Sequence, residues 1–230
     1  MKNPDERILK LFATQKDFGT VGPYRTTGGW WVPIYFDSRK AFSEPKKLTA
    51  FAEIFIELIR EKKIRFDVVV GGATAGMPIG LAVALKLKKP FCYVRKQAKK
   101  GGLCNAVEGY YKKGWKAILI DDFIANGTSK KAFIRNMRKD GLKVDTIIVA
   151  LRRPKKKNYS KIRKLKVKVY DFGSLDDLNE YMAKNNYITK EAFQLMNWYT
   201  KYPDTWQNDP KKMEYLKNYK KMKKNSKLGV

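Results

Sequence analysis

Residues 116–129 read KAILIDDFIANGTS, and the rest of the chain is organised around them. A short apolar run ends in the adjacent carboxylates Asp121 and Asp122, and a loop through Gly127 follows before a helical pattern resumes. The pattern predicts a buried strand, a loop and a helix. Because open α/β sheets bind ligands beyond the carboxyl ends of their strands, we expect a ligand site here.

The loop after the two carboxylates has the features of a phosphate site. Gly127 permits a tight turn, and the first N–H groups of the following helix are unpaired and lie at the positive end of its dipole. Asp121 and Asp122 can accept hydrogen bonds from a sugar diol or hold a divalent metal through its waters. The combination predicts a ribose 5-phosphate; the alternative is that the two carboxylates only end a strand and cap a turn.

Bulk composition predicts one soluble globular domain. The chain has 230 residues, of which 43% are hydrophobic, enough for a full core. No apolar run is long enough to span a membrane and the N-terminus does not resemble a signal peptide, so we expect a cytoplasmic protein. The two cysteines, Cys92 and Cys104, are expected to be free thiols, and the absence of histidine excludes a cysteine–histidine nucleophile.

The formal net charge of +28 favours polyanionic partners, which include nucleic acids and phosphorylated small molecules. Lysine accounts for most of the excess and is scattered along nearly every segment. Scatter of this kind is also typical of a lysine-rich surface without a specific partner.

Three segments follow from the hydrophobic pattern. Residues 1–45 are expected to form a short helix and a hood, in which the glycine- and aromatic-rich residues 18–31 form a turn-rich loop, a flap, that leads into a strand. Residues 46–173 alternate buried strands and helices, which predicts a parallel α/β core. Residues 174–230 are expected to be helices, two capped by Ser174 and Thr189 and a third opened at Pro210, with a lysine-rich tail from Lys211 that frays.

Two further loops lie near the predicted site. Gly71 to Gly76 follow a β-branched strand, and such small residues let a ligand oxygen approach the backbone N–H groups. Residues 95–105 are basic and interrupted by glycine, which is typical of a closing lid with cations for phosphate oxygens.

These motifs, in this order, resemble the type I phosphoribosyltransferases and, among them, the orotate phosphoribosyltransferases. Residues 118–129 look like the superfamily's phosphoribosyl-pyrophosphate (PRPP) motif, residues 95–99 (RKQAK) like the RKxxK lid, and residues 32–37 (VPIYFD) like the SPxYxD entry. The resemblance runs from about Phe18 to Arg153. It implies the parallel-sheet fold of that family, with an N-terminal hood and C-terminal helices.

The resemblance implies a reaction in which the phosphoribosyl group of PRPP is transferred to orotate in pyrimidine (UMP) biosynthesis. It implies Mg²⁺ as cofactor, held mainly through PRPP and water with Asp121 and Asp122 as candidate protein ligands, and a homodimer whose lid acts across the interface. By the same resemblance Lys96, Lys99, Asp121 and Asp122 would be catalytic. The residues implied to bind PRPP are Gly71, Gly72, Ala73, Thr74, Arg95, Lys96, Lys99, Lys100, Asp121, Asp122, Ala125, Asn126, Gly127, Thr128 and Ser129.

The base would be bound at the other end of the site, with Arg153 facing the carboxylate of orotate. The residues implied to contact the base are Arg25, Thr27, Tyr35, Phe36, Ala125 and Arg153.

Four positions depart from the family pattern. Gly101 replaces the lid histidine, Ala125 replaces a loop threonine, and Ala75 replaces a lysine of the pyrophosphate loop. In the flap, the base-contacting lysine falls at Thr27, with Arg25 as a substitute if the loop register slips. These departures affect the base more than the sugar phosphate, so transfer to another nucleobase stays an alternative. The second alternative is a basic regulator that binds nucleic acid with the same fold.

Overall fold

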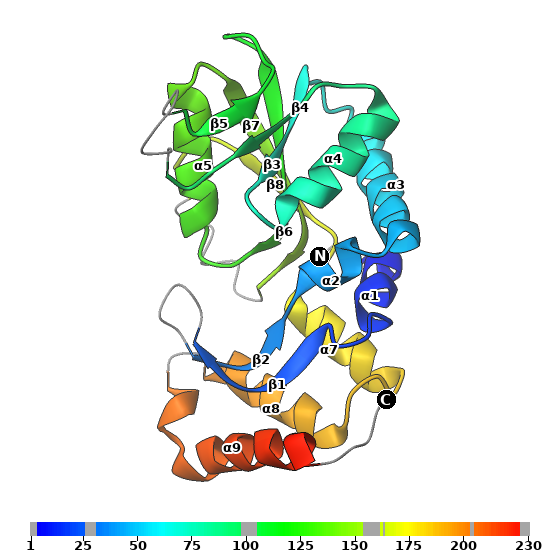
Figure 1. The fold of residues 1–230 in the computed structure, drawn as a ribbon, viewed down its shortest axis with the longest axis vertical. Coiled ribbons are helices and arrows are strands. Elements are labelled where there is room, and N and C mark those ends of the chain that lie inside the picture. The colour runs from blue at the N-terminus through cyan, green and yellow to red at the C-terminus, as the bar shows by residue number, and fades with distance from the viewer. Residues whose placement is uncertain are drawn as a thin grey trace.

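The computed structural model describes residues 4–25, 31–97, 105–153, 162, 164–202 and 205–225, with side chains described up to residue 218. An α/β body carries at one end a smaller part, made of a two-stranded hood and the C-terminal helices (Figure 1). Among the residues described, no helix combines the length and apolarity that crossing a membrane requires.

The body is built on a six-stranded sheet in the order β5-β4-β3-β6-β7-β8. Neighbours from β4 to β8 run parallel, which confirms the predicted parallel sheet, and β5 adds an antiparallel edge strand beside β4. The strand carrying the two adjacent carboxylates is β6, which lies between β3 and β7. The strand bounds are β3 Val68–Gly72, β4 Phe91–Val94, β5 Val107–Gly109, β6 Lys116–Ile124, β7 Lys143–Arg152 and β8 Lys168–Asp171.

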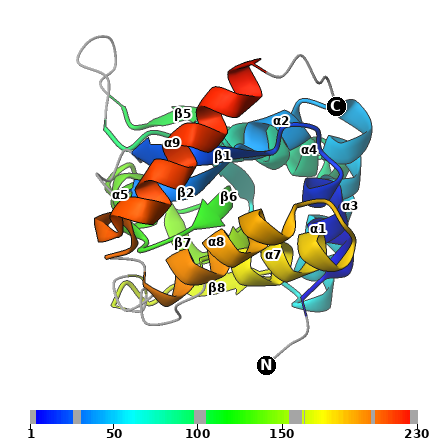
Figure 2. The same cartoon turned by 90° about the horizontal axis from the view of Figure 1, so that it is seen from below.

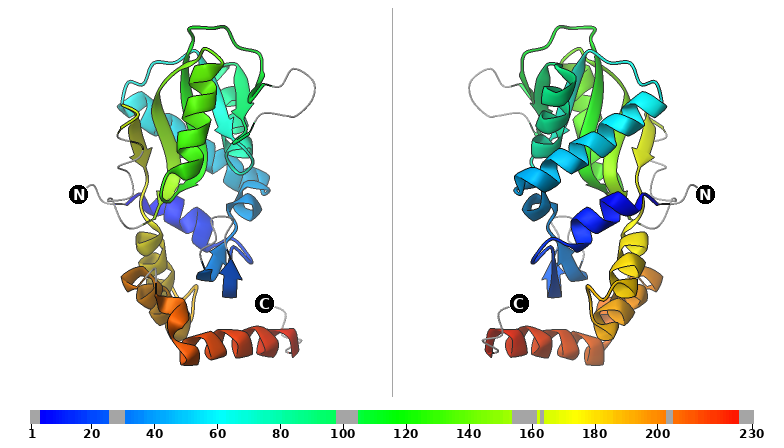
Figure 3. Two further views of the ribbon diagram at one scale, coloured as in Figure 1. Left: turned by 90° about the vertical axis from the view of Figure 1, so that its left-hand side faces the viewer. Right: turned by 90° about the vertical axis from the view of Figure 1, so that its right-hand side faces the viewer.

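Helices cover both faces of this sheet because its buried side chains alternate between two apolar clusters. In β6, Ile118 and Ile120 belong to the cluster under α1, α3, α4 and α7, whereas Ala117 and Leu119 belong to the cluster under α5. The two views of Figure 3 show α3 and α5 on opposite sides of the sheet. The helix bounds are α1 Glu6–Ala13, α3 Pro45–Glu61, α4 Gly76–Leu87, α5 Thr128–Lys139 and α7 Leu175–Lys184.

The hood is an antiparallel pair, β1 (Gly19–Arg25) and β2 (Trp31–Phe36). The prediction of a loop over residues 19–25 was wrong, since these residues pair with β2; residues 26–30 lie outside the described part of the chain. The tyrosine rings of Tyr24 and Tyr35 lie 5.9 Å apart across the pair, a contact that stabilises two-stranded sheets. The short helix α2 (Ser38–Phe42) then returns the chain to the body.

The C-terminal helices begin where their capping residues predicted. Ser174 and Asp177 form a reciprocal capping box at α7, and Thr189 caps α8 (Lys190–Lys201). After the short η2 (Trp206–Asn208), α9 runs from Pro210 to Asn225, so fraying was wrong for this part of the tail. Leu216 of α9 is fully buried, and the helix packs across β1 (Figure 2).

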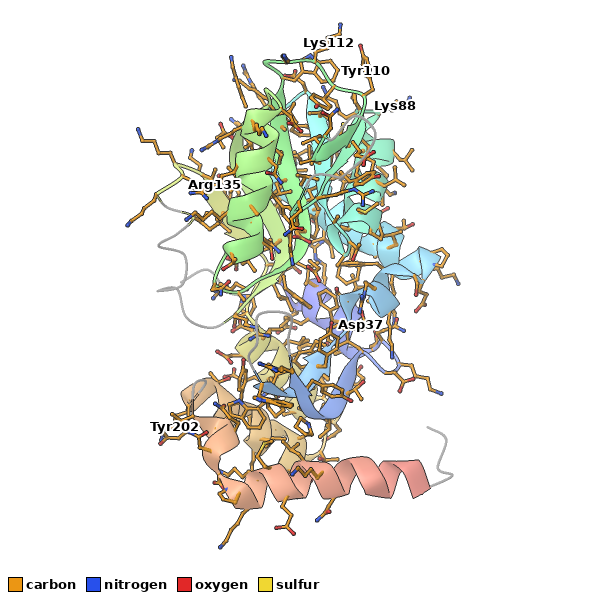
Figure 4. All side chains as sticks on the ribbon, turned by 60° about the vertical axis from the view of Figure 1, so that its left-hand side comes forward. Asp37, Lys88, Tyr110, Lys112, Arg135 and Tyr202 are labelled. Carbon is orange, nitrogen blue, oxygen red and sulfur yellow. The ribbon has the colours of Figure 1, made fainter. Side chains whose placement is uncertain are left out.

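Residues at the far end of the body carry part of the positive charge. Lys88, Lys112 and Arg135 lie on the body away from the hood, whereas Asp37 lies at the junction between the two parts (Figure 4). Cys92 is a buried free thiol, as predicted, and burial raises its pKa to about 11; Cys104 lies outside the described residues. The three-segment division stays a prediction.

Candidate active site

The central motif folds as the sequence predicted, with β6 followed by a loop and α5. Gly127 adopts φ +77° directly before the helix, a conformation that favours glycine, and a Cβ there would lie 2.8 Å from Cγ1 of Ile162. The N–H of Thr128 donates to Oδ1 of Asn126 at 3.1 Å. The loop leads directly into the N-terminus of a twelve-residue helix, the geometry that binds phosphate.

Asp121 is nearly inaccessible, with 4% of its surface exposed, and it pairs with a lysine that sequence reasoning missed. Nζ of Lys130 lies 2.6 Å from Oδ2 of Asp121, and it also donates to the carbonyl of Phe123. Burial raises the pKa of Asp121 to about 7, and the charge of Lys130 opposes that rise. A lysine in the first turn of a helix is unfavourable, because its positive charge lies at the positive end of the helix dipole. In the sequence, this unfavourable placement was the signal that Lys130 pairs with a carboxylate.

Asp122 differs from Asp121 in being partly exposed, and it contacts Ser38 at the start of α2, the helix that follows the hood. Oγ of Ser38 donates to Oδ2 of Asp122 at 2.6 Å, and Ser38 itself is 3% exposed. The N–H of Asp122 donates to Oδ1 of Asp121 at 2.9 Å. Ser38 follows the predicted VPIYFD entry by one residue, so the entry motif marked the place but not this contact.

The second small-residue loop presses against Asp121. Gly71 and Gly72 belong to β3, Gly76 opens α4, and the peptide bond between Ala73 and Thr74 is cis. A Cβ on Gly72 would lie 2.6 Å from Oδ2 of Asp121, and one on Gly76 would lie 2.8 Å from its Oδ1. Only glycine lets these two backbone segments approach the carboxylate so closely.

Two hollows lie on either side of this centre. The polar hollow lies between the connection from the hood to the body (residues 35–39), the loop after β3 (residues 73–75), the two carboxylates and α5. Its lining residues are Tyr35, Phe36, Asp37, Ser38, Arg39, Ala73, Thr74, Ala75, Lys96, Asp121, Asp122, Ser129, Lys130 and Phe133. The apolar hollow lies between β2, residues 125–129 (the phosphate loop) and the helices α7 and α8. Its lining residues are Val32, Ile34, Tyr35, Phe36, Phe123, Ala125, Asn126, Gly127, Thr128, Ser129, Lys130, Arg153, Leu175, Met196 and Tyr199.

The two hollows share four lining residues, Tyr35, Phe36, Ser129 and Lys130, so they adjoin. Sequence reasoning missed Arg39, which lines the polar hollow and whose guanidinium lies 2.6 Å from Asp37. That ion pair raises the pKa of Arg39. The arrangement suits an elongated ligand with an anionic end in the polar hollow and a planar end in the apolar one.

Some predicted residues line neither of these hollows. Arg95 turns to Oε1 of Glu108 at 3.2 Å and to the hydroxyl of Tyr93 at 3.1 Å, and Arg25 belongs to β1. Gly71 and Gly72 lie behind the polar hollow. The structure does not describe Thr27, Lys99, Lys100 and Gly101.

The side chains at this site fit a Mg²⁺ ion that takes most of its ligands from the phosphates of a bound substrate. Among the residues described, no cluster of three or more acidic, histidine or cysteine side chains forms a metal cage. Asp121 and Asp122 offer two adjacent carboxylates at the polar hollow, and Mg²⁺ is commonly held by one or two carboxylates together with substrate phosphates.

Comparisons with known proteins agree with this geometry. Residues 39–176 match the family model described as a phosphoribosyl transferase domain. The chain is 32% identical over 185 residues to an orotate phosphoribosyltransferase of Coxiella burnetii, covering 80% of this chain and 88% of the relative. It is 30% identical over 206 residues to that of Phocaeicola vulgatus, covering 89% and 92%.

Solved structures share the fold. The orotate phosphoribosyltransferase of Aeropyrum pernix superposes with a TM-score of 0.65 at 24% identity, covering 76% of this chain and 99% of that one. The UMP synthase of Leishmania donovani gives a TM-score of 0.73 at 25% identity, covering 84% of this chain and 41% of that longer one. With a matching family model over more than half of its length and relatives of 30% identity or more, the chain belongs to the orotate phosphoribosyltransferase family.

Proposed function

We propose that this protein transfers the phosphoribosyl group of PRPP to orotate, with release of pyrophosphate, and that the two adjoining hollows divide the reactants between them. PRPP occupies the polar hollow and the phosphate loop, and orotate occupies the apolar hollow. The observation that carries the proposal is that the hollows share Tyr35, Phe36, Ser129 and Lys130, since the reacting carbon must lie where they meet.

The sugar phosphate is held from the sheet side. The amides and hydroxyls of residues 125–129 bind the 5-phosphate at the N-terminus of α5. Asp121 and Asp122 accept hydrogen bonds from the two ribose hydroxyls, and Lys130 balances the buried charge of Asp121. The backbone of residues 73–75 and the side chain of Lys96 bind pyrophosphate, and Gly71 and Gly72 let this loop lie against Asp121. A role for Arg95 stays a prediction, because its guanidinium pairs with Glu108 and Tyr93, and the roles of Lys99 and Lys100 stay predictions because both lie outside the described residues.

Orotate is held from the hood and C-terminal side. The rings of Tyr35 and Phe36 offer flat apolar surface to the base, and Ala125 leaves room beside them. Arg153, at the rim of the same hollow, pairs with the carboxylate of orotate, since a guanidinium presents parallel donors to a carboxylate.

The chain's residues promote transfer by orientation and electrostatics. The ribose C1 moves from the pyrophosphate oxygen to the base nitrogen, so positive charge develops on the ribose and negative charge on the leaving group. Preorganised donors such as Lys96 and the loop amides stabilise that negative charge, each by about 3 kcal/mol. Bound Mg²⁺ would neutralise pyrophosphate charge next to Asp121 and Asp122.

The direct test follows the loss of orotate absorbance with PRPP and Mg²⁺, beside uracil and other bases. We expect turnover of orotate, its loss when Mg²⁺ is chelated, and its loss in the double variant Asp121→Asn, Asp122→Asn. Consumption of another base but not of orotate would overturn the assignment of the base while keeping the sugar-phosphate chemistry.

Three further properties belong to the same proposal. We infer a homodimer in which the lid of one subunit closes on the site of the other, Mg²⁺ as the cofactor, and a cytoplasmic location. The family resemblance supports the homodimer and the cofactor, and the sequence pattern supports the location. Sedimentation of the purified protein and activity as a function of Mg²⁺ concentration test the first two.

A further inference from the structure

Helix α8 brings a tyrosine to the residue that is proposed to bind the carboxylate of the base. Nη1 of Arg153 donates to the hydroxyl of Tyr199 at 2.7 Å, and the guanidinium carbon lies 6.0 Å from the centre of the tyrosine ring. Both side chains line the apolar hollow. The contact joins positions 46 residues apart, so no local motif contains it.

Tyr199 is itself held in place by the C-terminal part of the chain. Its ring lies edge-on to that of Trp206, with the ring centres 5.9 Å apart and an angle of 89°. Trp206 is fully buried, and its Nε1 donates to the carbonyl of Trp31 at the start of β2, at 3.0 Å. One turn before Tyr199, Met196 is 4% exposed and packs in the same cluster as Ile34 of β2.

The backbone of Arg153 is anchored independently of this contact. Its N–H donates to the carbonyl of Ile124 at 2.8 Å, which ties the end of β7 to the end of β6. What remains variable is the direction of the long side chain, because arginine has many rotamers. A guanidinium has five N–H donors, so the one given to Tyr199 leaves others for a ligand.

We propose that Tyr199 is a positioning residue that orients Arg153 toward the anionic group of a planar base, so that α8 helps to determine which base is accepted. This inference rests on the proposed function, because it presumes that Arg153 binds the carboxylate of orotate. Tyr199 acts through Arg153, and its effect is confined to the base.

The test is Tyr199→Phe, which removes the hydroxyl and keeps the ring that packs on Trp206. The matched control is Tyr202→Phe, near the end of the same helix, where the side chain is 43% exposed and projects from the outer edge of the molecule (Figure 4). Initial rates are measured with orotate varied at saturating PRPP and with PRPP varied at saturating orotate, together with unfolding by denaturant.

We expect Tyr199→Phe to raise KM for orotate about tenfold, equivalent to about 1.4 kcal/mol. KM for PRPP should stay within about twofold, because the lost interaction concerns the base alone. Inhibition by uracil, which lacks the carboxylate, should change much less than KM for orotate. Tyr202→Phe should resemble the wild type in every assay.

Two results overturn the inference in distinguishable ways. If the wild type consumes orotate and Tyr199→Phe has the same KM for orotate as Tyr202→Phe, or if both KM values rise together, Tyr199 does not position Arg153. If the wild type does not consume orotate at all, the proposed function fails and the inference fails with it.

Discussion

The polar and apolar hollows are built in different ways, although they share an edge. The polar hollow is formed by the ends of β2 and β6, the loop after β3 and the beginnings of α2 and α5, and its walls carry carboxylates, hydroxyls, small residues and the cations Arg39, Lys96 and Lys130. The apolar hollow combines the phosphate loop with β2, α7 and α8, which meet only through long-range packing. Because only the apolar hollow depends on the C-terminal helices, changes in these helices should alter binding of the base and leave PRPP binding intact.

The largest expected effect is at the boundary, where Lys130 lines both hollows. Lys130→Met leaves Asp121 as a buried carboxylate without its partner, which should lower the free energy of unfolding by about 3–5 kcal/mol. Denaturant unfolding measures this loss, and both KM values should rise. Lys131→Met, at the more exposed neighbouring position, is the control. Equal losses in the two variants would show that the buried pair does not stabilise the centre.

A smaller effect is expected from Trp206→Phe, which tests the C-terminal side alone. The variant loses the donor to the carbonyl of Trp31 and should cost about 1–3 kcal/mol in unfolding free energy. KM for orotate should rise while KM for PRPP stays unchanged. Trp198→Phe is the matched control, since that ring contacts Trp206 at 5.9 Å but is only half-buried. A rise in KM for PRPP would break the division between the hollows.

Ser38→Ala tests the polar hollow, where KM for PRPP is the quantity expected to change. Removing the hydroxyl that donates to Asp122 should raise KM for PRPP about tenfold, the effect of one hydrogen bond to a charged group. KM for orotate should not change. Ser43→Ala removes an exposed hydroxyl that donates to the carbonyl of Lys40, and it should behave as the wild type. An effect on orotate rather than PRPP would contradict the assignment of Asp122.

The last effect is a gradual one, a pH dependence of stability that comes from Asp121. Its pKa is raised from 3.8 to about 7 by burial, so between these values the folded protein keeps a proton that the unfolded chain has released. The stabilising contribution is complete below about pH 4 and is lost as pH rises toward 7, by at most about 1.4 kcal/mol per pH unit.

Asp121→Asn should remove that slope, as measured by denaturant unfolding at several pH values. Asp37 gives a control of opposite sign, because the hydrogen bond from Arg39 lowers its pKa. Its stabilising contribution is therefore lost as pH falls, and Asp37→Asn should remove a loss of stability at acid pH. Between pH 4 and pH 7 the wild type should lose more stability than Asp121→Asn does. An equal change in the two proteins would show that the pKa of Asp121 is not raised.

The parts of the site that sequence reasoning found are those set by neighbours along the chain. The strand, loop and helix around Asp121 and Gly127 follow from local pattern, as do the caps at Ser174 and Thr189. Among the missed contacts, Ser38 meets Asp122 from 84 residues away and Tyr199 meets Arg153 from 46 residues away, whereas Lys130 lies on the helix that directly follows the Asp121 strand. Which distant side chains meet depends on the packing of whole elements, and no local spacing encodes it.

Residues 19–25 show the same limit in the fold. Their glycines and proline indicate a loop when taken alone, yet pairing with β2 and packing of α9 make them a strand. Tertiary contacts overrode local propensity there. The buried face of α9 was missed for a related reason, because lysines dominate its sequence and Leu216 contacts a surface that only the folded hood provides.

The central claim, that the two hollows divide PRPP and orotate, is tested most directly by calorimetric titration of PRPP with Mg²⁺. The titration compares the wild type with Arg153→Ala and with the double variant Asp121→Asn, Asp122→Asn. We predict that Arg153→Ala binds PRPP as tightly as the wild type and no longer turns over orotate efficiently, whereas the double variant loses PRPP binding. Loss of PRPP binding in Arg153→Ala, or its retention in the double variant, would contradict the account.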